Sequence, residues 1–183
     1  AAAYAIGRIF DCSVPSILVA LKSFKGLAHR MEDLGPVPGI RFVNDSKATN
    51  INSTGKALAC YKNILWIAGG LSKEDSLEGL QSYFRSVCCA FLIGEAAEKF
   101  AAELEGQIPV TISGDLGSAF SDAHAYALSK NLEEPTILLS PACSSFDQFM
   151  NFEARGNQFK ELVEALRMPE MEMGSGLPAG ELM

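Results

Sequence analysis

The chain has 183 residues, and its 15 basic and 22 acidic side chains give a formal net charge of −7. This acidity disfavours a broad electrostatic surface for nucleic acid or anionic lipid. The longest run without a charged residue has 12 residues, whereas a membrane-spanning helix needs about 20. We therefore expect no nucleic-acid partner and no membrane span.

The first 28 residues predict two helices separated by a short break. Ser13 can cap the second helix and Pro15 fits its first turn, ahead of apolar side chains at helical spacing. Because the Ala-rich start has neither Met nor a secretory signal, we expect the chain to begin inside a helix of a longer protein. Residues 33–39, rich in Gly and Pro, predict a connector at a domain junction.

Regular α/β patterning follows the connector. Short runs rich in Val, Ile, Leu or Phe, each followed by turn-forming residues, predict buried strands at 40–43, 63–68, 87–93, 108–112 and 135–140. Helical spacing of apolar residues marks three of the intervening or following stretches, which carry Leu77, Leu80 and Phe84; Leu116, Phe120, Ala123 and Ala127; and Phe152, Phe159, Val163 and Leu166. The alternation predicts an α/β fold with an open, mainly parallel sheet and helices on both faces, from about residue 32 to 168. Residues 169–183 have no periodicity and predict a flexible tail.

Ligands bind open α/β sheets at the carboxyl ends of the strands. The loop after 40–43 carries Asp45, Lys47 and Thr49, the loop after 63–68 carries Lys73, and the loop after 135–140 carries Ser145. In an acidic chain, lysines at two of five strand ends indicate a small anionic ligand. The alternative is that both are solvated surface lysines.

Motifs of several other classes are absent from the sequence. It has no G-x-G-x-x-G for a dinucleotide, no G-x-x-x-x-G-K-[ST] phosphate loop and no G-x-S-x-G hydrolase elbow. Its five cysteines include no Cys-x-x-Cys pair, and it has two histidines. We therefore expect buried, reduced thiols in a cytoplasmic protein and no metal site.

Four stretches, taken in order, resemble the Mur ligase family, the ATP-dependent amino-acid-adding enzymes of peptidoglycan precursor synthesis. The last stretch is long and typical of the D-glutamate-adding members, and the D-N-P-R pattern of the diaminopimelate- or lysine-adding members does not occur. The stretches are Leu27-Ala28-His29-Arg30-Met31-Glu32, Asn44-Asp45-Ser46-Lys47-Ala48-Thr49-Asn50, Gly69-Gly70 with Lys73, and residues 140–157 from Ser140-Pro141-Ala142-Cys143-Ser144-Ser145 onward.

The resemblance implies a domain organisation. Residues 1–31 would be the end of a central ATP-binding domain, and residues 32–168 a Rossmann-like C-terminal domain that binds the incoming amino acid. The N-terminal and central domains would be missing, and with them the phosphate loop and the ligands of Mg²⁺. The full-length enzyme would use ATP and Mg²⁺ to join D-glutamate to UDP-N-acetylmuramoyl-L-alanine through an acyl phosphate.

The resemblance also implies a role for individual residues. Lys47 would be catalytic, neutralising charge near the γ-phosphate and the tetrahedral intermediate. ATP would contact Asp45 through its ribose and Arg30 through its phosphates. D-glutamate would be bound by Thr49, Lys73, Ser145, Phe146 and the backbone amide of Phe152.

Simpler interpretations of four of these residues remain open. Asp45 could cap its own turn, and Arg30 could pair with Glu32 or Asp33. Ser145 could cap a helix, and the Phe152 side chain could belong to the core. Arg155, in the last of the four stretches, is expected to form structural hydrogen bonds rather than to act in catalysis.

Two expectations and two alternatives concern the chain as a whole. We expect it to be inactive alone and to dimerise through residues 1–28, whose apolar side chains would lack their partners. It could instead belong to a Mur ligase that adds another amino acid. It could also be a non-catalytic substrate-binding or interaction module.

Overall fold

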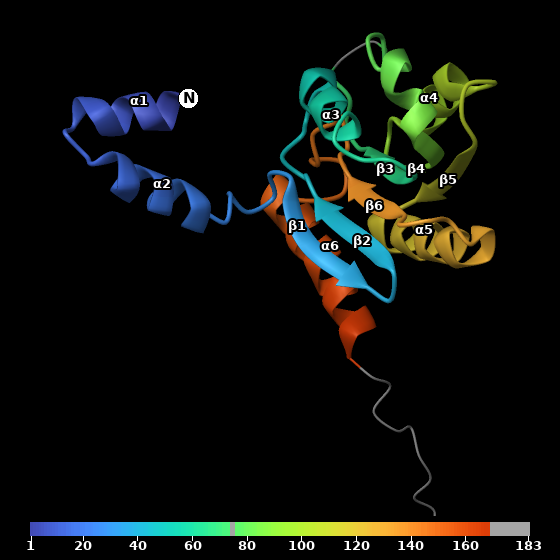
Figure 1. The fold of residues 1–183 in the computed structure, drawn as a ribbon. Coiled ribbons are helices and arrows are strands. Elements are labelled where there is room, and N and C mark those ends of the chain that lie inside the picture. Colours follow the sequence, from blue (N-terminus) through green and yellow to red (C-terminus); the bar gives the residue numbers. More distant parts are fainter. Residues whose placement is uncertain (74–75, 169–183) are drawn as a thin grey trace, which may run out of the picture.

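The computed structural model describes residues 1–73 and 76–168, so the predicted tail at 169–183 lies outside the described residues (Figure 1). Its six strands form one sheet in the order β1-β2-β6-β3-β4-β5, in which β1 is antiparallel to β2 and the other neighbours are parallel. The strands are β1 (Glu32–Val37), β2 (Ile40–Asn44), β3 (Ile64–Gly69), β4 (Val87–Ile93), β5 (Val110–Gly114) and β6 (Thr136–Leu139). The predicted open, mainly parallel α/β sheet is confirmed.

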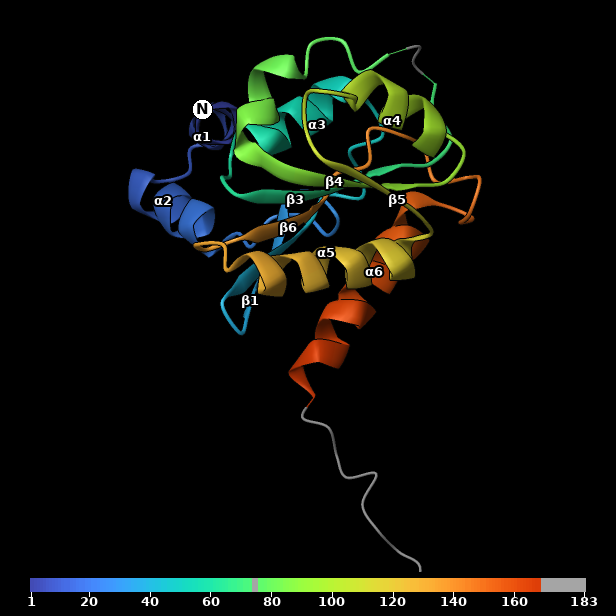
Figure 2. The same cartoon turned by 90° about the vertical axis from the view of Figure 1, so that its right-hand side faces the viewer.

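Helices cover both faces of this sheet. Figure 2 shows α3 and α4 on one side, and α5 and α6 on the other. The helices are α1 (Ala2–Ile9), α2 (Val14–Ser23), α3 (Ile51–Leu58), α4 (Ala97–Leu104), α5 (Leu116–Lys130) and α6 (Phe152–Arg167), with a 3₁₀-helix at Gln81–Ser86. Among the described residues, no helix is both long enough and apolar enough to cross a membrane.

The four inner strands β2, β6, β3 and β4 are buried on both faces, because each contributes side chains to two cores. Trp66 and Leu92 face the core beneath α3 and α4, whereas Ile67 and Phe91 face the core beneath α5 and α6. This two-sided burial explains why the strands are almost continuous apolar runs in the sequence.

Two segments differ from the sequence-based expectation. Residues 33–39 are not a linker: Glu32–Val37 is an edge strand, which tolerates Pro36, and Gly39 at φ +80° turns the chain into β2. The stretch around Leu77 and Leu80 is no α-helix, because Gly79 at φ +94° interrupts it, although both leucines are buried as expected.

The N-terminal helices α1 and α2 stand apart from the sheet (Figure 1). As predicted, Ser13 caps α2: its Oγ accepts the backbone N–H of Ser16 at 3.2 Å. Ile17 is the single buried residue of the two helices. Large apolar side chains are exposed along both and just beyond them: Tyr4, Ile6, Ile9, Phe10, Val14, Leu18, Val19, Leu21, Phe24 and Leu27.

All five cysteines are free thiols, in agreement with the sequence. Burial was expected for most of them, but only Cys89 and Cys143 are buried, and Cys12 and Cys60 are exposed. Burial raises the pKa of the Cys89 thiol to about 11, so this thiol stays protonated at neutral pH.

Candidate active site

The parallel strands β2 to β6 all end at the same edge of the sheet, which we call the carboxyl edge. The β6 loop, residues 140–151, binds the neighbouring strand ends together. Leu71, just after β3, pairs with Ser144 through backbone hydrogen bonds of 3.0 and 3.1 Å. The backbone N–H of Glu95, just after β4, donates to Asp147 Oδ2 at 3.1 Å. One loop therefore gathers the ends of three strands.

Glycine is required where the β6 loop comes closest. A Cβ on Gly70, which has φ +123°, would overlap the carbonyl oxygen of Ser144. A Cβ on Gly94, at φ +68°, would overlap the Asp147 carboxylate. Both positions combine a left-handed backbone with close packing, so only glycine fits them without strain.

Arg155, on the first turn of α6, connects the β6 loop to the β2 loop, residues 45–50. Its side chain has no exposed surface. The guanidinium donates to Ser46 Oγ and Ser46 O at 3.0 Å each, to Cys143 O at 3.0 Å and to Ser144 O at 3.4 Å. Burial lowers the pKa of Arg155 to about 10, which still leaves it protonated at neutral pH.

Asp45 bridges three segments at the same edge. Its Oδ1 accepts the backbone N–H of Met31 at 3.1 Å, and its Oδ2 accepts the hydroxyl of Ser140 at 3.1 Å. Burial raises the pKa of Asp45 above its usual value, although these hydrogen bonds and the nearby Arg30 act in the opposite direction. The carboxylate does not cap its own turn, so that simpler interpretation is wrong.

The segment that leads from α2 into β1 is clamped to the β2 loop. The backbone N–H of Lys47 donates to His29 O at 3.0 Å, and Asn44 Nδ2 lies 3.0 Å from His29 Nδ1. Asn44 Nδ2 also donates to Gly156 O at 3.0 Å, which ties the same point to α6.

Arg30 is exposed, and the acidic residues that follow it in this segment pair with other side chains. Glu32 pairs with Lys160 at 2.8 Å, and Asp33 pairs with Arg41. Neither acid is a partner of Arg30, so the simpler pairing proposed from the sequence is wrong.

Lys47 and Phe152 meet directly. The Lys47 Nζ atom lies 3.8 Å from the centroid of the Phe152 ring. The ring is half-buried and belongs to neither hydrophobic core, which contradicts the expectation that this side chain is core. It also makes a T-shaped contact with the His29 ring, with ring centroids 6.1 Å apart.

Ser145 is buried in the β6 loop but does not cap a helix. Its carbonyl accepts the backbone N–H of Gln148 at 3.1 Å and that of Phe149 at 2.7 Å, which forms a turn. Helix α6 is capped instead by Asn151, whose Oδ1 accepts the N–H of Ala154 at 2.7 Å. The Ser145 hydroxyl is therefore not used as a cap.

Comparison with known proteins gives the chain its family. It is 53% identical over 146 residues to UDP-N-acetylmuramoylalanine--D-glutamate ligase from Rhodopseudomonas palustris (strain HaA2), a match that covers 80% of this chain and 31% of the relative. It is 46% identical over 166 residues to the ligase of the same name from Caulobacter vibrioides (strain NA1000 / CB15N), covering 91% of this chain and 35% of the relative. The chain belongs to the Mur ligase family. It spans about a third of the length of the curated relatives it matches.

A solved structure supports the fold. The bifunctional folylpolyglutamate synthase/dihydrofolate synthase from Yersinia pestis CO92 aligns with a TM-score of 0.51 and 14% identity, over 86% of this chain and 35% of that chain. At this identity the likeness concerns the fold alone. No family model matches the chain.

The structure places the family-related site residues on adjoining loops of the carboxyl edge. Lys47 and Thr49 are half-buried in the β2 loop, Ser145 is buried in the β6 loop, and Lys73 is exposed after β3. Phe146 is 64% exposed on the β6 loop. The described contacts join these loops through Arg155, the Leu71–Ser144 pair and the hydrogen bond from Ser140 to Asp45.

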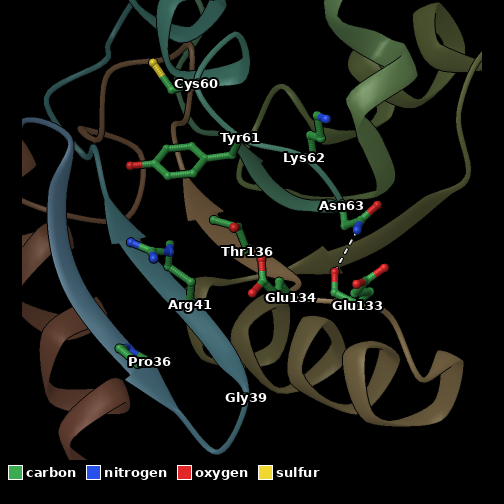
Figure 3. Close-up of a pocket in the computed structure, with 10 residues that line it drawn as sticks. All are labelled: Pro36, Gly39, Arg41, Cys60, Tyr61, Lys62, Asn63, Glu133, Glu134 and Thr136. Atoms are coloured by element: carbon green, nitrogen blue, oxygen red, sulfur yellow. Dashed lines mark hydrogen bonds between the residues drawn. The ribbon is translucent and has the colours of Figure 1, made fainter.

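A large hollow lies at the opposite edge of the sheet, away from these family motifs. It has a volume of about 780 Å³ and opens at the amino ends of β2, β3 and β6 (Figure 3). Arg41 in this hollow already pairs with Asp33, and Asn63 donates to the Glu133 carbonyl at 2.7 Å. The hollow is lined by Pro36, Gly39, Arg41, Cys60, Tyr61, Lys62, Asn63, Glu133, Glu134 and Thr136.

Sequence reasoning assigned no role to two of the residues that join the loops, Asn44 and Ser46, although both lie within the family motifs. Arg155 was expected to form structural hydrogen bonds, and the structure confirms this. One signal was available for Arg155: it lies between Phe152 and Phe159 on the apolar face of α6. A charged residue on a buried helical face indicates an internal hydrogen-bond network.

Proposed function

We propose that this chain is the amino-acid-binding domain of a ligase that adds D-glutamate to UDP-N-acetylmuramoyl-L-alanine with ATP. The proposal is supported by one observation, the position of the family motifs in the fold. Residues 44–50, 69–73 and 140–157 carry the family motifs, and they meet at one edge of the sheet. The names of the curated relatives supply the substrates.

The proposed amino-acid site matches the chemistry of D-glutamate, which has two carboxylates and an amine. Lys73 would supply a positive charge, and Thr49, Ser145 and the Phe152 amide would supply hydrogen-bond donors. Phe146 would line the mouth of the site with an exposed apolar ring. Lys47 would be the catalytic residue, because its ammonium can stabilise negative charge that develops on the reacting groups.

The nucleotide would contact Asp45 and Arg30. Each Asp45 oxygen already accepts one hydrogen bond, and its remaining lone pairs can accept from ribose hydroxyls. Arg30 is exposed and pairs with neither Glu32 nor Asp33, which leaves its guanidinium available for phosphate. These residues fit an ATP-binding role.

We propose that the phosphate loop and the ligands of Mg²⁺ belong to the two thirds of the ligase that this chain does not span. In the described part of the chain, no three His, Cys, Asp or Glu side chains form a metal-binding group. Residues 1–31 would then end the central domain, residues 32–168 would form the amino-acid domain, and the whole enzyme would act in the cytoplasm.

A hybrid ligase tests this function. The matching third of the Rhodopseudomonas palustris ligase, which is 53% identical, is replaced by this chain. We expect amide formation with D-glutamate and ATP, and no turnover by the 183-residue chain alone. Preference for another amino acid would assign the chain to a different ligase. D-glutamate binding by a hybrid that turns over no amino acid would assign a non-catalytic module.

Lys73→Ala in the hybrid tests the amino-acid site. Removal of a charge-assisted hydrogen bond should raise the KM for D-glutamate about ten- to a hundredfold. Lys62→Ala is the matched control, because Lys62 is an exposed lysine in the hollow at the opposite edge. An unchanged KM for Lys73→Ala would remove Lys73 from the site.

A further inference from the structure

The contact between Lys47 and Phe152 joins two elements that are far apart in the sequence. Lys47 lies in the β2 loop and Phe152 is the first residue of α6. An ammonium 3.8 Å from a ring centroid is well within the range at which the negative face of the ring attracts a cation. A lysine side chain has many rotamers in solution, so this attraction selects a small set of them.

The ring that Lys47 contacts is itself held in place from two sides. The carbonyl of Phe152 accepts the Ser46 hydroxyl at 2.8 Å, and Ser46 in turn accepts from the buried Arg155. The ring also packs against His29 in a T-shaped arrangement, at an interplanar angle of 78°. The backbone and the ring are therefore positioned without any ligand.

The group that contacts the Lys47 ammonium determines whether its positive charge stays available to a ligand. A carboxylate would orient the ammonium but also neutralise it and compete with an anionic substrate. A phenyl ring orients the ammonium while leaving its charge and its hydrogen-bond donors available. In the described residues, Lys47 is a member of no ion pair.

We propose that the Phe152 side chain is a positioning residue for Lys47: its ring holds the ammonium at the carboxyl edge, ready for an anionic substrate group. This role rests on the proposed function and is separate from the role of the Phe152 backbone amide. Because any substitution of Phe152 except proline keeps that amide, the two roles can be tested independently.

NMR of the 183-residue chain tests the contact without any ligase activity. Ring current should move the Lys47 Hε signal upfield of the other lysines, and Lys47→Met assigns the signal by removing it. Phe152→Leu should return the signal to its ordinary position, whereas Phe152→Trp should keep it upfield but at a different shift, because the indole has a larger ring current. Lys130, which lies 5.6 Å from the Tyr126 ring, is the internal reference and should not respond.

The backbone amide spectrum shows whether each variant is folded. If Phe152→Leu fails to fold, Phe152→Trp still decides, because the larger ring must change the Lys47 shift. A Lys47 signal at the ordinary lysine position, or one insensitive to Phe152→Trp, would overturn the proposal.

Kinetics of the hybrid ligase test the consequence. Phe152→Leu should lower kcat about two- to fivefold with little change in the KM for D-glutamate, and Phe152→Tyr should restore most of kcat. Leu128→Ala is the control, because Leu128 is exposed near the carboxyl end of α5, away from the β2 and β6 loops. A raised KM with unchanged kcat would assign the ring to substrate binding and overturn the proposal. An unmodified hybrid that is inactive with every amino acid would contradict the proposed function instead, and NMR would then decide the contact alone.

Discussion

The N-terminal helices and the sheet domain contain similar apolar side chains but bury them very differently. In the sheet domain, Phe159 has no exposed surface and packs against Phe42 and Phe120. On the N-terminal helices, Phe10 and Ile9 are each 76% exposed. An amphipathic pattern thus predicts a helix in both regions, but only tertiary contacts decide whether its apolar face is covered.

The two regions of the chain therefore differ in how they are stabilised. Residues 32–167 have two hydrophobic cores and a network of buried polar groups, which are the features of a folded domain. Helices α1 and α2 line an open apolar hollow of about 550 Å³ between them and bury little else. Exposed apolar surface of this kind marks an interaction site.

The largest expected effect tests the burial contrast directly. Phe159→Ala should lower the free energy of unfolding by about 3–5 kcal/mol, because it removes a fully buried ring and leaves a cavity. Phe10→Ala should change it by less than about 0.5 kcal/mol. Urea denaturation of both variants gives the comparison, and equal losses would show that the N-terminal helices are as well packed as the sheet.

Arg155 offers the next largest effect. Arg155→Met should lower the free energy of unfolding by roughly 2–4 kcal/mol, because it leaves buried carbonyls of the β2 and β6 loops without donors. Arg167→Met is the control on the same helix; Arg167 is exposed, pairs with Glu164 and donates to Leu34 O. The control should lose less than about 1 kcal/mol in the same urea experiment. Equal losses would contradict a special role for the buried network.

Deletion of residues 1–26 tests whether the two regions are independent. The sheet domain should keep its free energy of unfolding within about 1 kcal/mol, because His29 and Met31, which contact the β2 loop, remain. Light scattering should show a dimer of the whole chain at high concentration and a monomer after the deletion. A dimer that survives the deletion would place the contact on the sheet domain.

The smallest effect concerns two carboxyl groups whose pKa values shift in opposite directions. Burial raises the pKa of Asp45, so the folded state keeps this proton to a higher pH than the unfolded state does. Stability linked to Asp45 therefore falls as the pH rises from the unfolded pKa to the folded pKa. Asp45→Asn should remove this loss and, at neutral pH, raise the free energy of unfolding by no more than about 1 kcal/mol.

Asp115 provides the opposite sign. Hydrogen bonds from Ser118 lower the pKa of Asp115, so its contribution is present above the unfolded pKa and is lost as the pH falls through the folded pKa. The free energy of unfolding should be measured from pH 3 to 7 for both variants. Asp45→Asn should remove a decrease in this free energy as the pH rises, and Asp115→Asn should remove an increase. A change of the same sign in both would contradict the burial argument for Asp45.

The sequence by itself determined the elements whose signals are local. β4 was predicted with its observed bounds, because a strand buried on both faces is a continuous apolar run. The cap at Ser13 depends on neighbouring residues and was also predicted. The strand-end loops with Lys47, Lys73 and Ser145 could be located for the same reason, since they directly follow these strands.

Only the tertiary structure decided the features that depend on residues far apart in the chain. β1 was missed because its Pro and Gly are tolerated only at a sheet edge beside β2. The Arg155 network and the Lys47–Phe152 contact join segments more than 100 residues apart, and no local pattern specifies such pairs. Local preferences act within a few residues, whereas buried polar partners are selected by the packing of the whole domain.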